Sequence, residues 1–418
     1  MIKLLNITPH VGGGVGNVIK ELTNNLLVSQ TIICLDEIKN NNINSTIIFD
    51  DMINHISDIL DMIKDSDIVL LHYWNHPLLY KFLLENDIPE CRLIVWSHTL
   101  GIYHPYNIHK DIVDMSSIFV LASEASYESP VIKNTFDKDK IKVIRSTGGI
   151  EQFNNLKRIE HEGINILYVG TLDYSKLHRN FVNMCLSINR ENVKFILCGE
   201  MSDEVLNDIN NCSHPEKFII KGKIDNIKEQ LQIADIFGYP LSDKNYSTGE
   251  LVLGEAMIAG IVPVVIDNLP ESYIVQNNYN GLIVSESEYS NAVMKLIDDI
   301  DLRNRLSTNA IESAKEIYST KKMINGWKSL IYDIMFCNKK NIILNYNTNC
   351  IDGFNIFAYS LDDLQNLFLN YDEEKIIDLF KSSDQWNSLN KGSVRQYLSY
   401  FPDDTNLKEL VRLLDNIT

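Results

Sequence analysis

The stretch that decides the fold is STGELVLGEAMIAGIVPVV, residues 247–265. Its apolar residues fit a core helix over 249–259 that ends at a glycine and leads into a β-branched strand over 261–266. Glu255 lies inside this apolar helix, where an ionised carboxylate is rarely found without a partner. A helix that follows a parallel strand points its N-terminus at the place where open α/β sheets bind anions. The stretch therefore predicts an α/β fold with a ligand site near Glu255.

Strand and helix patterns alternate on both sides of this stretch. The expected strands are 2–7, 31–35, 45–49, 68–72, 92–97, 118–122, 142–144, 164–169, 193–198, 218–221, 236–239 and 261–266. The expected helices include 17–28, 177–189, 202–211, 225–234, 249–259, 288–300, 301–317 and 320–337. This alternation predicts two doubly wound α/β domains, each with a mostly parallel sheet that helices cover on both faces.

The chain of 418 residues is too long for one ordinary core. The alternation pauses at a polar connector, 151–163. We therefore expect an N-terminal Rossmann-like domain over 1–155 and a second Rossmann-like domain over 156–337. Residues 338–418 open with an Asn-rich stretch and continue with short acidic helical patterns. They predict a small, mainly helical C-terminal appendage.

Composition limits the partners and the compartment. The formal net charge of −18 argues against nucleic acid, because proteins that bind phosphate backbones normally show a basic face. The seven cysteines form no CxxC pair, which favours reduced core thiols. No run approaches the ~20 apolar residues that span a bilayer, and the N-terminus lacks the pattern of a signal peptide. We expect a soluble cytoplasmic chain, and a peripheral position at the inner membrane face stays open.

Two loops contain candidate phosphate ligands. Gly12-Gly13-Gly14-Val15-Gly16 follows the first expected strand and opens a helix, so its backbone N–H groups can approach a phosphate closely. The alternative for this run is a simple tight turn. Lys176 follows the strand that ends at Gly170 and Thr171, and a lysine there can reach a phosphate as a point charge. The alternative for Lys176 is a solvated surface side chain.

Three further side chains are candidates with stated alternatives. Glu250 fits either a ligand role or a capping box, Ser247-x-x-Glu250, in which serine caps the helix. The apolar neighbours of Glu255 leave its carboxylate in need of hydroxyl donors or a basic partner. His98 follows the end of an expected strand, where site residues gather, although a structural histidine fits equally well. The segment HYWNH, 72–76, lacks the glutamate of HExxH and does not predict a metal site.

These motifs together resemble a retaining glycosyltransferase of family four, which has the GT-B fold of two Rossmann-like domains facing a cleft. The resemblance covers about residues 1–335. It rests on the Gly-rich loop, on His98, on Gly170-Thr171-Leu172 with Lys176, and above all on Glu255-Ala256-Met257-Ile258-Ala259-Gly260 followed by Pro263-Val264-Val265. Leu269-Pro270-Glu271 and Asn280-Gly281-Leu282 also resemble the family.

The chain departs from the family at two positions. The family's first glutamate, eight positions before Glu255, falls on Ser247, and its phosphate-binding arginine falls on Thr171. The resemblance implies that Glu255 binds the ribose hydroxyls of the donor. It leaves the contact to the donor sugar open, with Glu250 as a candidate, and Arg179 could replace the missing guanidinium.

The resemblance thus implies a donor-binding site and a smaller group of catalytic residues. The implied donor-binding residues are Gly13, Gly14, Val15, Gly170, Thr171, Lys176, Arg179, Ser247, Thr248, Gly249, Glu250, Leu251 and Glu255. The implied catalytic residues are His98, Lys176 and Glu250. No metal site and no cofactor are expected, since the nucleotide sugar is the substrate.

The resulting expectation is a retaining, metal-independent glycosyltransferase of cell-surface polysaccharide or glycoconjugate synthesis. It would move a sugar from a nucleoside-diphosphate donor, with UDP favoured over GDP, to a glycan, lipid-linked or protein acceptor. A catalytically weak GT-B subunit that stabilises a partner is one alternative, suggested by Ser247, Thr171 and the helical appendage. The protein partner would then bind through 338–418. A GT-B sugar-nucleotide epimerase is the other.

Overall fold

The computed structural model describes residues 1–36, 48–49, 52–346 and 351–417, which form two compact units. The first unit comprises Met1–Gly148, Tyr246–Gly249 and Thr320–Thr418, and the second comprises Gly149–Asn245 and Glu250–Ser319. The chain therefore enters the first unit three times. Each unit contains one doubly wound sheet, and the predicted fold class is confirmed in both.

The first unit is built on a seven-stranded parallel sheet in the order β3-β2-β1-β4-β5-β6-β7. Its strands are β1 (Lys3–Thr8), β2 (Ser29–Cys34), β3 (Ile48–Phe49), β4 (Ile68–Tyr73), β5 (Leu93–Ser97), β6 (Ile118–Leu121) and β7 (Ile141–Val143). The rest of the predicted strand 45–49 lies outside the described residues. The strand order reverses between β1 and β4, and ligands of doubly wound sheets bind beyond the carboxyl ends of the strands at such a point.

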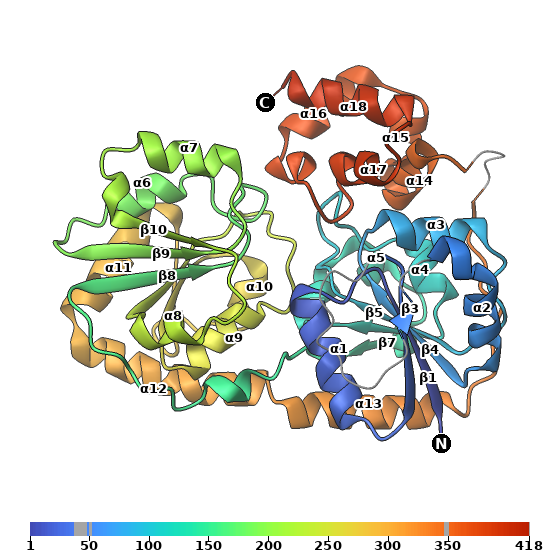
Figure 1. Ribbon diagram of the computed structural model, residues 1–418, viewed down its shortest axis with the longest axis horizontal. Coiled ribbons are helices and arrows are strands. Elements are labelled where there is room, and N and C mark those ends of the chain that lie inside the picture. The colour runs from blue at the N-terminus through green and yellow to red at the C-terminus, as the bar shows by residue number, and fades with distance from the viewer. Residues whose placement is uncertain (37–47, 50–51, 347–350, 418) are drawn as a thin grey trace. The chain divides into compact units, whose positions relative to one another are not determined.

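Helices cover both faces of this sheet (Figure 1). They are α1 (Gly13–Asn25), α2 (Met52–Asp65), α3 (Pro77–Glu85), α4 (Lys110–Met115), α5 (Pro130–Asn134) and α13 (Thr320–Ile334). Helices α1 and α13 contact each other. Trp327 of α13 packs edge to face on Trp96 of β5, with 4.7 Å between ring centroids. On the other face of the sheet, alternate strand residues such as Leu71 and Tyr73 pack in a hydrophobic core with residues of α2, α3 and α4.

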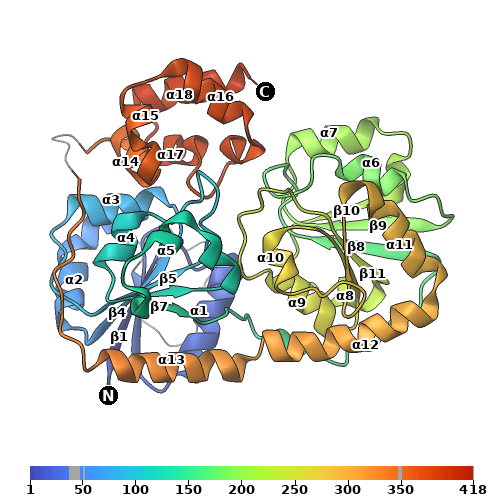
Figure 2. The same cartoon turned by 180° about the vertical axis from the view of Figure 1, so that it is seen from behind.

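The last part of the chain is mainly helical, as predicted. It contains α14 (Gly353–Ser360), α15 (Gln365–Leu369), α16 (Glu373–Lys381), α17 (Val394–Tyr400) and α18 (Thr405–Asp415). Helices α14 and α17 contact α3 and lie next to it in both views of the chain (Figures 1 and 2). Phe357 and Tyr397 are fully buried in the same hydrophobic cluster as Tyr80 of α3. The appendage therefore shares its core with the N-terminal domain.

The second unit contains a six-stranded parallel sheet in the order β10-β9-β8-β11-β12-β13. Its strands are β8 (Ile164–Val169), β9 (Val193–Cys198), β10 (Phe218–Gly222), β11 (Ile236–Tyr239), β12 (Val262–Ile266) and β13 (Leu282–Val284). Its helices are α6 (Phe181–Leu186), α7 (Asp203–Asn211), α8 (Lys228–Ile233), α9 (Leu251–Ile258), α10 (Leu269–Ser272), α11 (Tyr289–Asp298) and α12 (Ile300–Ile317). Here the strand order reverses between β8 and β11.

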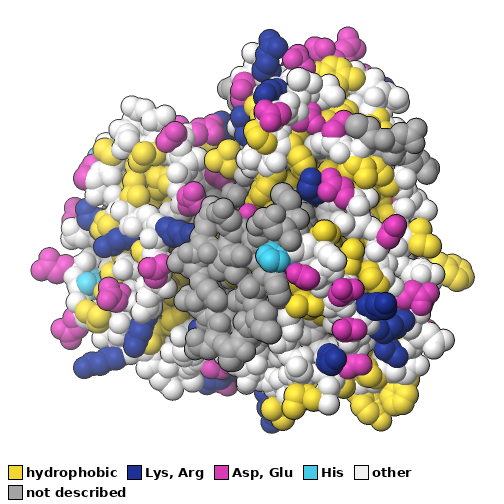
Figure 3. Space-filling model, turned by 45° about the vertical axis from the view of Figure 1, so that its right-hand side comes forward, with side chains coloured by type: hydrophobic (Ala, Val, Ile, Leu, Met, Phe, Trp, Pro, Cys, Tyr) yellow, Lys and Arg dark blue, Asp and Glu magenta, His cyan; other side chains and the backbone are white. Residues whose placement is uncertain are grey.

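The surface and the cysteines add two observations. On the described part of the face that Figure 3 draws, Lys and Arg side chains are interspersed with Asp and Glu. The six cysteines in the described ranges are free thiols, and Cys350 lies outside those ranges. In the part of the chain that the structure describes, no helix is both long enough and apolar enough to cross a bilayer.

Candidate active site

Helix α9 is shorter than predicted and is capped differently. It begins at Leu251, and Glu250 occupies the N-cap with left-handed backbone angles, φ 39° and ψ 50°. Of the two alternatives for Glu250, the capping box with Ser247 at the N-cap does not fit this geometry. The hydroxyl of Tyr318 donates a 3.0 Å hydrogen bond to the backbone carbonyl of Glu250. A non-glycine residue in this region costs of order 1–3 kcal/mol, so the contacts of Glu250 must hold it in place.

The carboxylate of Glu250 lies in a buried network that we call the carboxyl cluster, formed by Lys176, Tyr239, Asn245, Glu250 and Glu271. Tyr239 donates a 2.6 Å hydrogen bond to Oε2 of Glu250. The side-chain amide of Asn245 donates to Oε1 of Glu250 at 2.8 Å and to Oε1 of Glu271 at 2.9 Å. One amide thus joins two glutamates in the interior of the second unit.

Glu271 is the neutral member of the carboxyl cluster. Its side chain is fully buried, and its Oε2 has no hydrogen-bond partner among the described residues. Burial, reinforced by the nearby carboxylate of Glu250, raises the pKa of Glu271 to about 8. A neutral Glu271 avoids a second carboxylate beside Glu250 in the interior, which makes this burial tolerable.

Lys176 is the cationic member of the carboxyl cluster. Its Nζ lies 3.9 Å from Oε2 of Glu250 and 5.6 Å from the centre of the Tyr239 ring. Only 13% of its side chain is exposed, so the alternative of a solvated surface lysine does not fit. Lys176 follows β8 and Tyr239 ends β11, which places the cluster where the strand order of the sheet reverses.

Glu255 stands apart from this network. It lies on α9 beyond the N-cap, and its side chain is partly exposed. Burial alone raises the pKa of Glu255 to about 7. Among the described residues no hydrogen bond or ion pair reaches its carboxylate. Polar groups in such surroundings normally have a partner, and a ligand with hydroxyl groups would supply one.

The other residues predicted around the donor differ in their surroundings. Gly170 directly follows β8 and has a φ of +151°, and Tyr168 donates a 2.9 Å hydrogen bond to the carbonyl of Thr171. The guanidinium of Arg179 forms a 2.6 Å ion pair with Glu204 and lies 4.4 Å from the centre of the Tyr174 ring. Neither of these partners belongs to the carboxyl cluster.

Ser247, Thr248 and Gly249 belong with Tyr246 to the first unit, whereas the chain up to Asn245 and from Glu250 belongs to the second. The segment is anchored through Tyr246. Its carbonyl accepts a 3.0 Å hydrogen bond from the backbone N–H of Leu100, and its ring lies 4.6 Å from that of Tyr106. The structure therefore joins Lys176 to Glu250 directly, and it assigns the three residues before Glu250 to the other unit.

The predicted Gly-rich loop in the first unit is a strand-to-helix turn. Helix α1 begins at Gly13, whose φ of +60° favours glycine, and its N-cap is Gly12. Gly12, Gly13 and Gly14 are exposed, and Val15 is half-buried. The first N–H groups of α1 are therefore available to an anion.

His98 directly follows β5, as predicted, and its ring is only partly buried. Its Nε2 lies 3.0 Å from Nδ1 of His72, which is fully buried. His76 has a different function, since its Nδ1 accepts a 3.2 Å hydrogen bond from the backbone N–H of Leu78 and caps α3. The two histidines of the HYWNH segment thus have separate partners.

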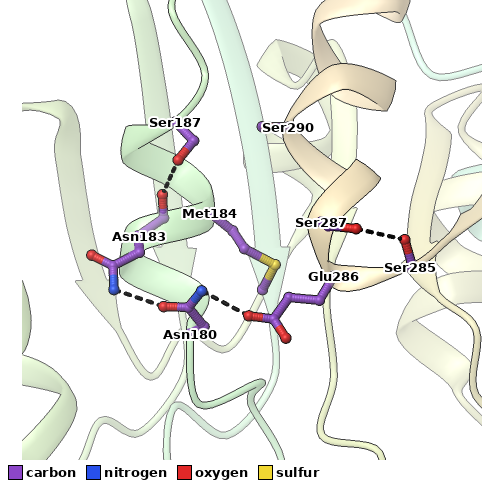
Figure 4. Close-up of a pocket in the computed structure, with 8 residues that line it drawn as sticks. All are labelled: Asn180, Asn183, Met184, Ser187, Ser285, Glu286, Ser287 and Ser290. Atoms are coloured by element: carbon purple, nitrogen blue, oxygen red, sulfur yellow. Dashed lines mark hydrogen bonds between the residues drawn. The ribbon is translucent and has the colours of Figure 1, made fainter.

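A polar cavity of about 510 Å³ opens elsewhere in the second unit. It lies between α6 and the start of α11, with Asn180 and Glu286 joined by a 2.7 Å hydrogen bond across it (Figure 4). Its lining is Asn180, Asn183, Met184, Ser187, Ser285, Glu286, Ser287 and Ser290. None of the residues predicted from the sequence lines this cavity.

The sequence of the second unit matches a known family. Residues 150–313 fit the description "Glycosyl transferases group 1". These residues form a glycosyl transferases group 1 domain. The matched range contains Lys176, Glu250 and Glu255, and so includes both the carboxyl cluster and the unpaired carboxylate. The match agrees with the expected class of enzyme, a glycosyltransferase.

Individual relatives of the group 1 domain are distant. N-acetyl-alpha-D-glucosaminyl L-malate synthase of Bacillus anthracis is 24% identical over 163 residues, which cover 37% of this chain and 42% of that protein. An uncharacterized 41.2 kDa protein in the cps region of Klebsiella pneumoniae is 24% identical over 365 residues, covering 78% of this chain and 98% of the relative. The chain thus spans less than half of the first relative and almost all of the second.

Solved structures confirm the GT-B fold around the group 1 domain. A crystal structure of Anabaena Alr3699/HepE in complex with UDP and glucose has a TM-score of 0.64 with 13% sequence identity. The match covers 80% of this chain and all of that one. A likeness at this identity speaks for the fold alone.

Three residues of the carboxyl cluster were missed by the sequence analysis: Tyr239, Asn245 and Glu271. Tyr239 reads as an ordinary residue of an apolar strand, and Asn245 reads as part of a polar loop. The one available signal was Glu271, an acidic residue directly after the buried strand β12 and the turn that follows it. The sequence does not show that Glu271 belongs to the cluster, because its hydrogen-bond donor, Asn245, lies 26 residues earlier in the chain.

Proposed function

We propose that this chain is a retaining, metal-independent glycosyltransferase that moves a sugar from a nucleoside-diphosphate donor to an acceptor hydroxyl. The observation that carries the proposal is the unpaired carboxylate of Glu255 on α9, within the group 1 domain. A carboxylate accepts hydrogen bonds from two adjacent hydroxyls, and the ribose of a nucleotide presents such a pair. We assign the ribose to Glu255.

The diphosphate would lie at the N-terminus of α9 and at Lys176. Backbone N–H groups at a helix start favour anions, and α9 begins at Leu251, next to the carboxyl cluster. Donors fixed in place before the reaction can each contribute about 3–4 kcal/mol to stabilising developing charge. Lys176 would neutralise the leaving diphosphate and make a metal ion unnecessary. Gly170, Thr171 and Arg179 complete the proposed donor residues of this unit.

Glu250 is proposed to hold Lys176 in position. Its carboxylate accepts from Tyr239 and Asn245 and faces the Lys176 ammonium, so its oxygens already have partners. A direct contact between Glu250 and the donor sugar would require one of these partners to be replaced. In the first unit, Gly13, Gly14, Val15, Ser247, Thr248 and Gly249 are proposed to contribute backbone or hydroxyl donors, and His98 is proposed to contact the transferred sugar.

The proposed donor is a UDP-sugar, and the proposed setting is synthesis of a cell-surface glycan or glycoconjugate. Support comes from the UDP and glucose bound to the Anabaena protein of the same fold and from the cps-region relative that aligns over almost its whole length. The acceptor would be a glycan, lipid-linked or protein hydroxyl. A peripheral membrane position and a protein partner at 338–418 would fit a cytoplasmic enzyme of this kind.

A second candidate is a catalytically weak subunit that stabilises a partner enzyme. One observation favours it: the carboxylate of Glu250 already accepts hydrogen bonds from Tyr239 and Asn245. Ser247 occupies the position of the family's first glutamate, so no other glutamate replaces it there. If the chain is such a subunit, the purified protein should bind the donor but should not turn it over.

Thermal unfolding of the purified chain with UDP, GDP and ADP, followed by assays with the matching nucleotide sugars, tests the proposal. A ligand that binds the folded state raises the apparent melting temperature by mass action. We expect stabilisation by UDP above GDP and ADP, without added metal and in the presence of a chelator. Release of UDP from a UDP-sugar would identify an enzyme. Stabilisation by no nucleotide would contradict the proposal.

A further inference from the structure

A line of four polar side chains crosses the sheet of the first unit and ends at His98. The four, Gln30, Asn6, His72 and His98, lie on β2, β1 and β4 and just after β5, which are consecutive strands of the sheet. We call them the amide–histidine relay. Asn6 and His72 are fully buried, whereas His98 is partly exposed. The relay therefore leads from the interior to a ring that a ligand can reach.

The first two members fix the orientation of the amides. Nε2 of Gln30 donates a 3.2 Å hydrogen bond to the backbone carbonyl of Leu22 in α1, and a carbonyl only accepts. Oε1 of Gln30 therefore faces Asn6, whose Nδ2 lies 3.5 Å from it. The same Nδ2 lies 3.4 Å from the carbonyl of Thr31. Two acceptors on one side place the Oδ1 of Asn6 on the side of His72.

The orientation of Asn6 fixes the proton of His72. Oδ1 of Asn6 lies 3.4 Å from Nε2 of His72, and because an amide oxygen only accepts, Nε2 must bear the proton. Burial lowers the pKa of His72 to about 3, so the ring is neutral and has one N–H. Its Nδ1 is then an acceptor.

The acceptor Nδ1 of His72 in turn determines where His98 bears its proton. Nδ1 of His72 lies 3.0 Å from Nε2 of His98, and the two ring planes are 8° apart, so an N–H on His98 can point at the lone pair of His72. Burial and the neighbouring His72 hold the pKa of His98 well below its usual range. A neutral ring with its proton on Nε2 leaves Nδ1 as an acceptor.

We propose that Asn6 and His72 are positioning residues that hold His98 as the Nε2–H tautomer, so that its Nδ1 accepts a hydrogen bond from a substrate hydroxyl. The chemical class of the ligand group is a hydroxyl that donates, as on a sugar. The contact with a sugar rests on the proposed function, whereas the tautomer does not. His98 can then neither donate through Nδ1 nor act as an acid there.

Nitrogen-15 NMR of histidine-labelled full-length protein tests the tautomer. His98→Gln identifies the His98 signals by their loss. In the wild-type protein we expect a protonated Nε2 and an unprotonated Nδ1 on His98. A proton on Nδ1 of His98 would overturn the proposal. This readout uses the wild-type protein, so it stands even if a relay variant folds poorly.

A variant of Asn6 tests the origin of the tautomer. Asn6→Leu removes the acceptor for His72, so His98 should become a mixture of tautomers. Asn24→Leu, at an exposed position of α1, is the matched control and should change nothing. If Asn6→Leu folds and leaves the His98 signals unchanged, the relay does not set the tautomer.

Transfer kinetics test the contact with the substrate. Asn6→Leu should lower kcat/KM about tenfold, the scale of one lost hydrogen bond. In a His98→Gln background Asn6→Leu should have no further effect, because both changes act through one contact. Full additivity, or an unaffected His98→Gln enzyme, would overturn the substrate contact. A chain with no transfer at all would instead count against the proposed function.

Discussion

The amide of Asn245 holds Glu250 and Glu271 together, with 2.8 Å to one carboxyl oxygen and 2.9 Å to the other. Two buried carboxyl groups on one donor are stable together only if one of them is neutral. Glu271 is that group, since burial and Glu250 raise its pKa to about 8. The side chains of Tyr239 and Asn245 thus hold the N-cap residue of α9, Glu250, from inside the domain.

The raised pKa of Glu271 predicts a pH-dependent stability. Between its unfolded pKa near 4.5 and its folded pKa near 8, the folded chain binds a proton that the unfolded chain releases. Stability should therefore fall as pH rises through this window, by up to about 1.4 kcal/mol per pH unit for this group. Glu271→Gln should flatten the dependence. Urea unfolding at pH 5.5, 6.5 and 7.5 measures it, and parallel slopes for both proteins would contradict the assignment.

Tyr239→Phe should destabilise the second unit. The change removes the hydroxyl that donates to the buried carboxylate of Glu250, and a hydrogen bond to a charged group contributes about 1.5–3 kcal/mol. Tyr279→Phe is the matched control, because the side chain of Tyr279 is 49% exposed. Chemical unfolding of both variants measures the difference. Equal stability of the two variants would show that Glu250 does not depend on Tyr239.

Two glycine-to-alanine substitutions should change the stability of the chain in opposite directions. At Gly254 of α9 an added Cβ would lie 2.7 Å from the ring of Tyr318, so Gly254→Ala should cost about 1–3 kcal/mol and disturb the N-cap that Tyr318 holds. At Gly326 of α13 the nearest atom would be 3.5 Å away, an ordinary contact. Gly326→Ala should therefore stabilise the chain by about 0.5–1 kcal/mol through helix propensity. Thermal or urea unfolding decides both signs, and two changes of the same sign would be the contrary result.

Lys176→Met should weaken binding of UDP but not of uridine. The lysine is proposed to contact only the diphosphate, so its loss removes a charge-assisted contact of about 1.5–3 kcal/mol from one ligand. As the salt concentration rises, the UDP affinity of the wild type should also fall more steeply than that of Lys176→Met. Calorimetric titration of both ligands, with the exposed Lys223→Met as control, gives the comparison. An equal loss for uridine would indicate a general structural role for Lys176.

Local patterns predicted the fold, because each strand and helix of a doubly wound domain shows its own periodicity. They also located Glu255, since a charge in an apolar helix is visible in the sequence. The sequence left a capping box open for Glu250, because the contacts of its carboxylate with Tyr239 and Asn245 are not visible in a local motif. The relay was missed for a similar reason, since His72 and its partner Asn6 are 66 residues apart.

Calorimetric titration of UDP into Glu255→Gln is the most direct test of the central claim, that α9 presents Glu255 to a nucleotide ribose. Glu229→Gln, at an exposed position in the same domain, is the control. We predict that Glu255→Gln binds UDP about 10- to 100-fold more weakly, the loss expected for hydrogen bonds to a charged group, while the control binds like the wild type. Unchanged UDP affinity in a folded Glu255→Gln protein would contradict the site.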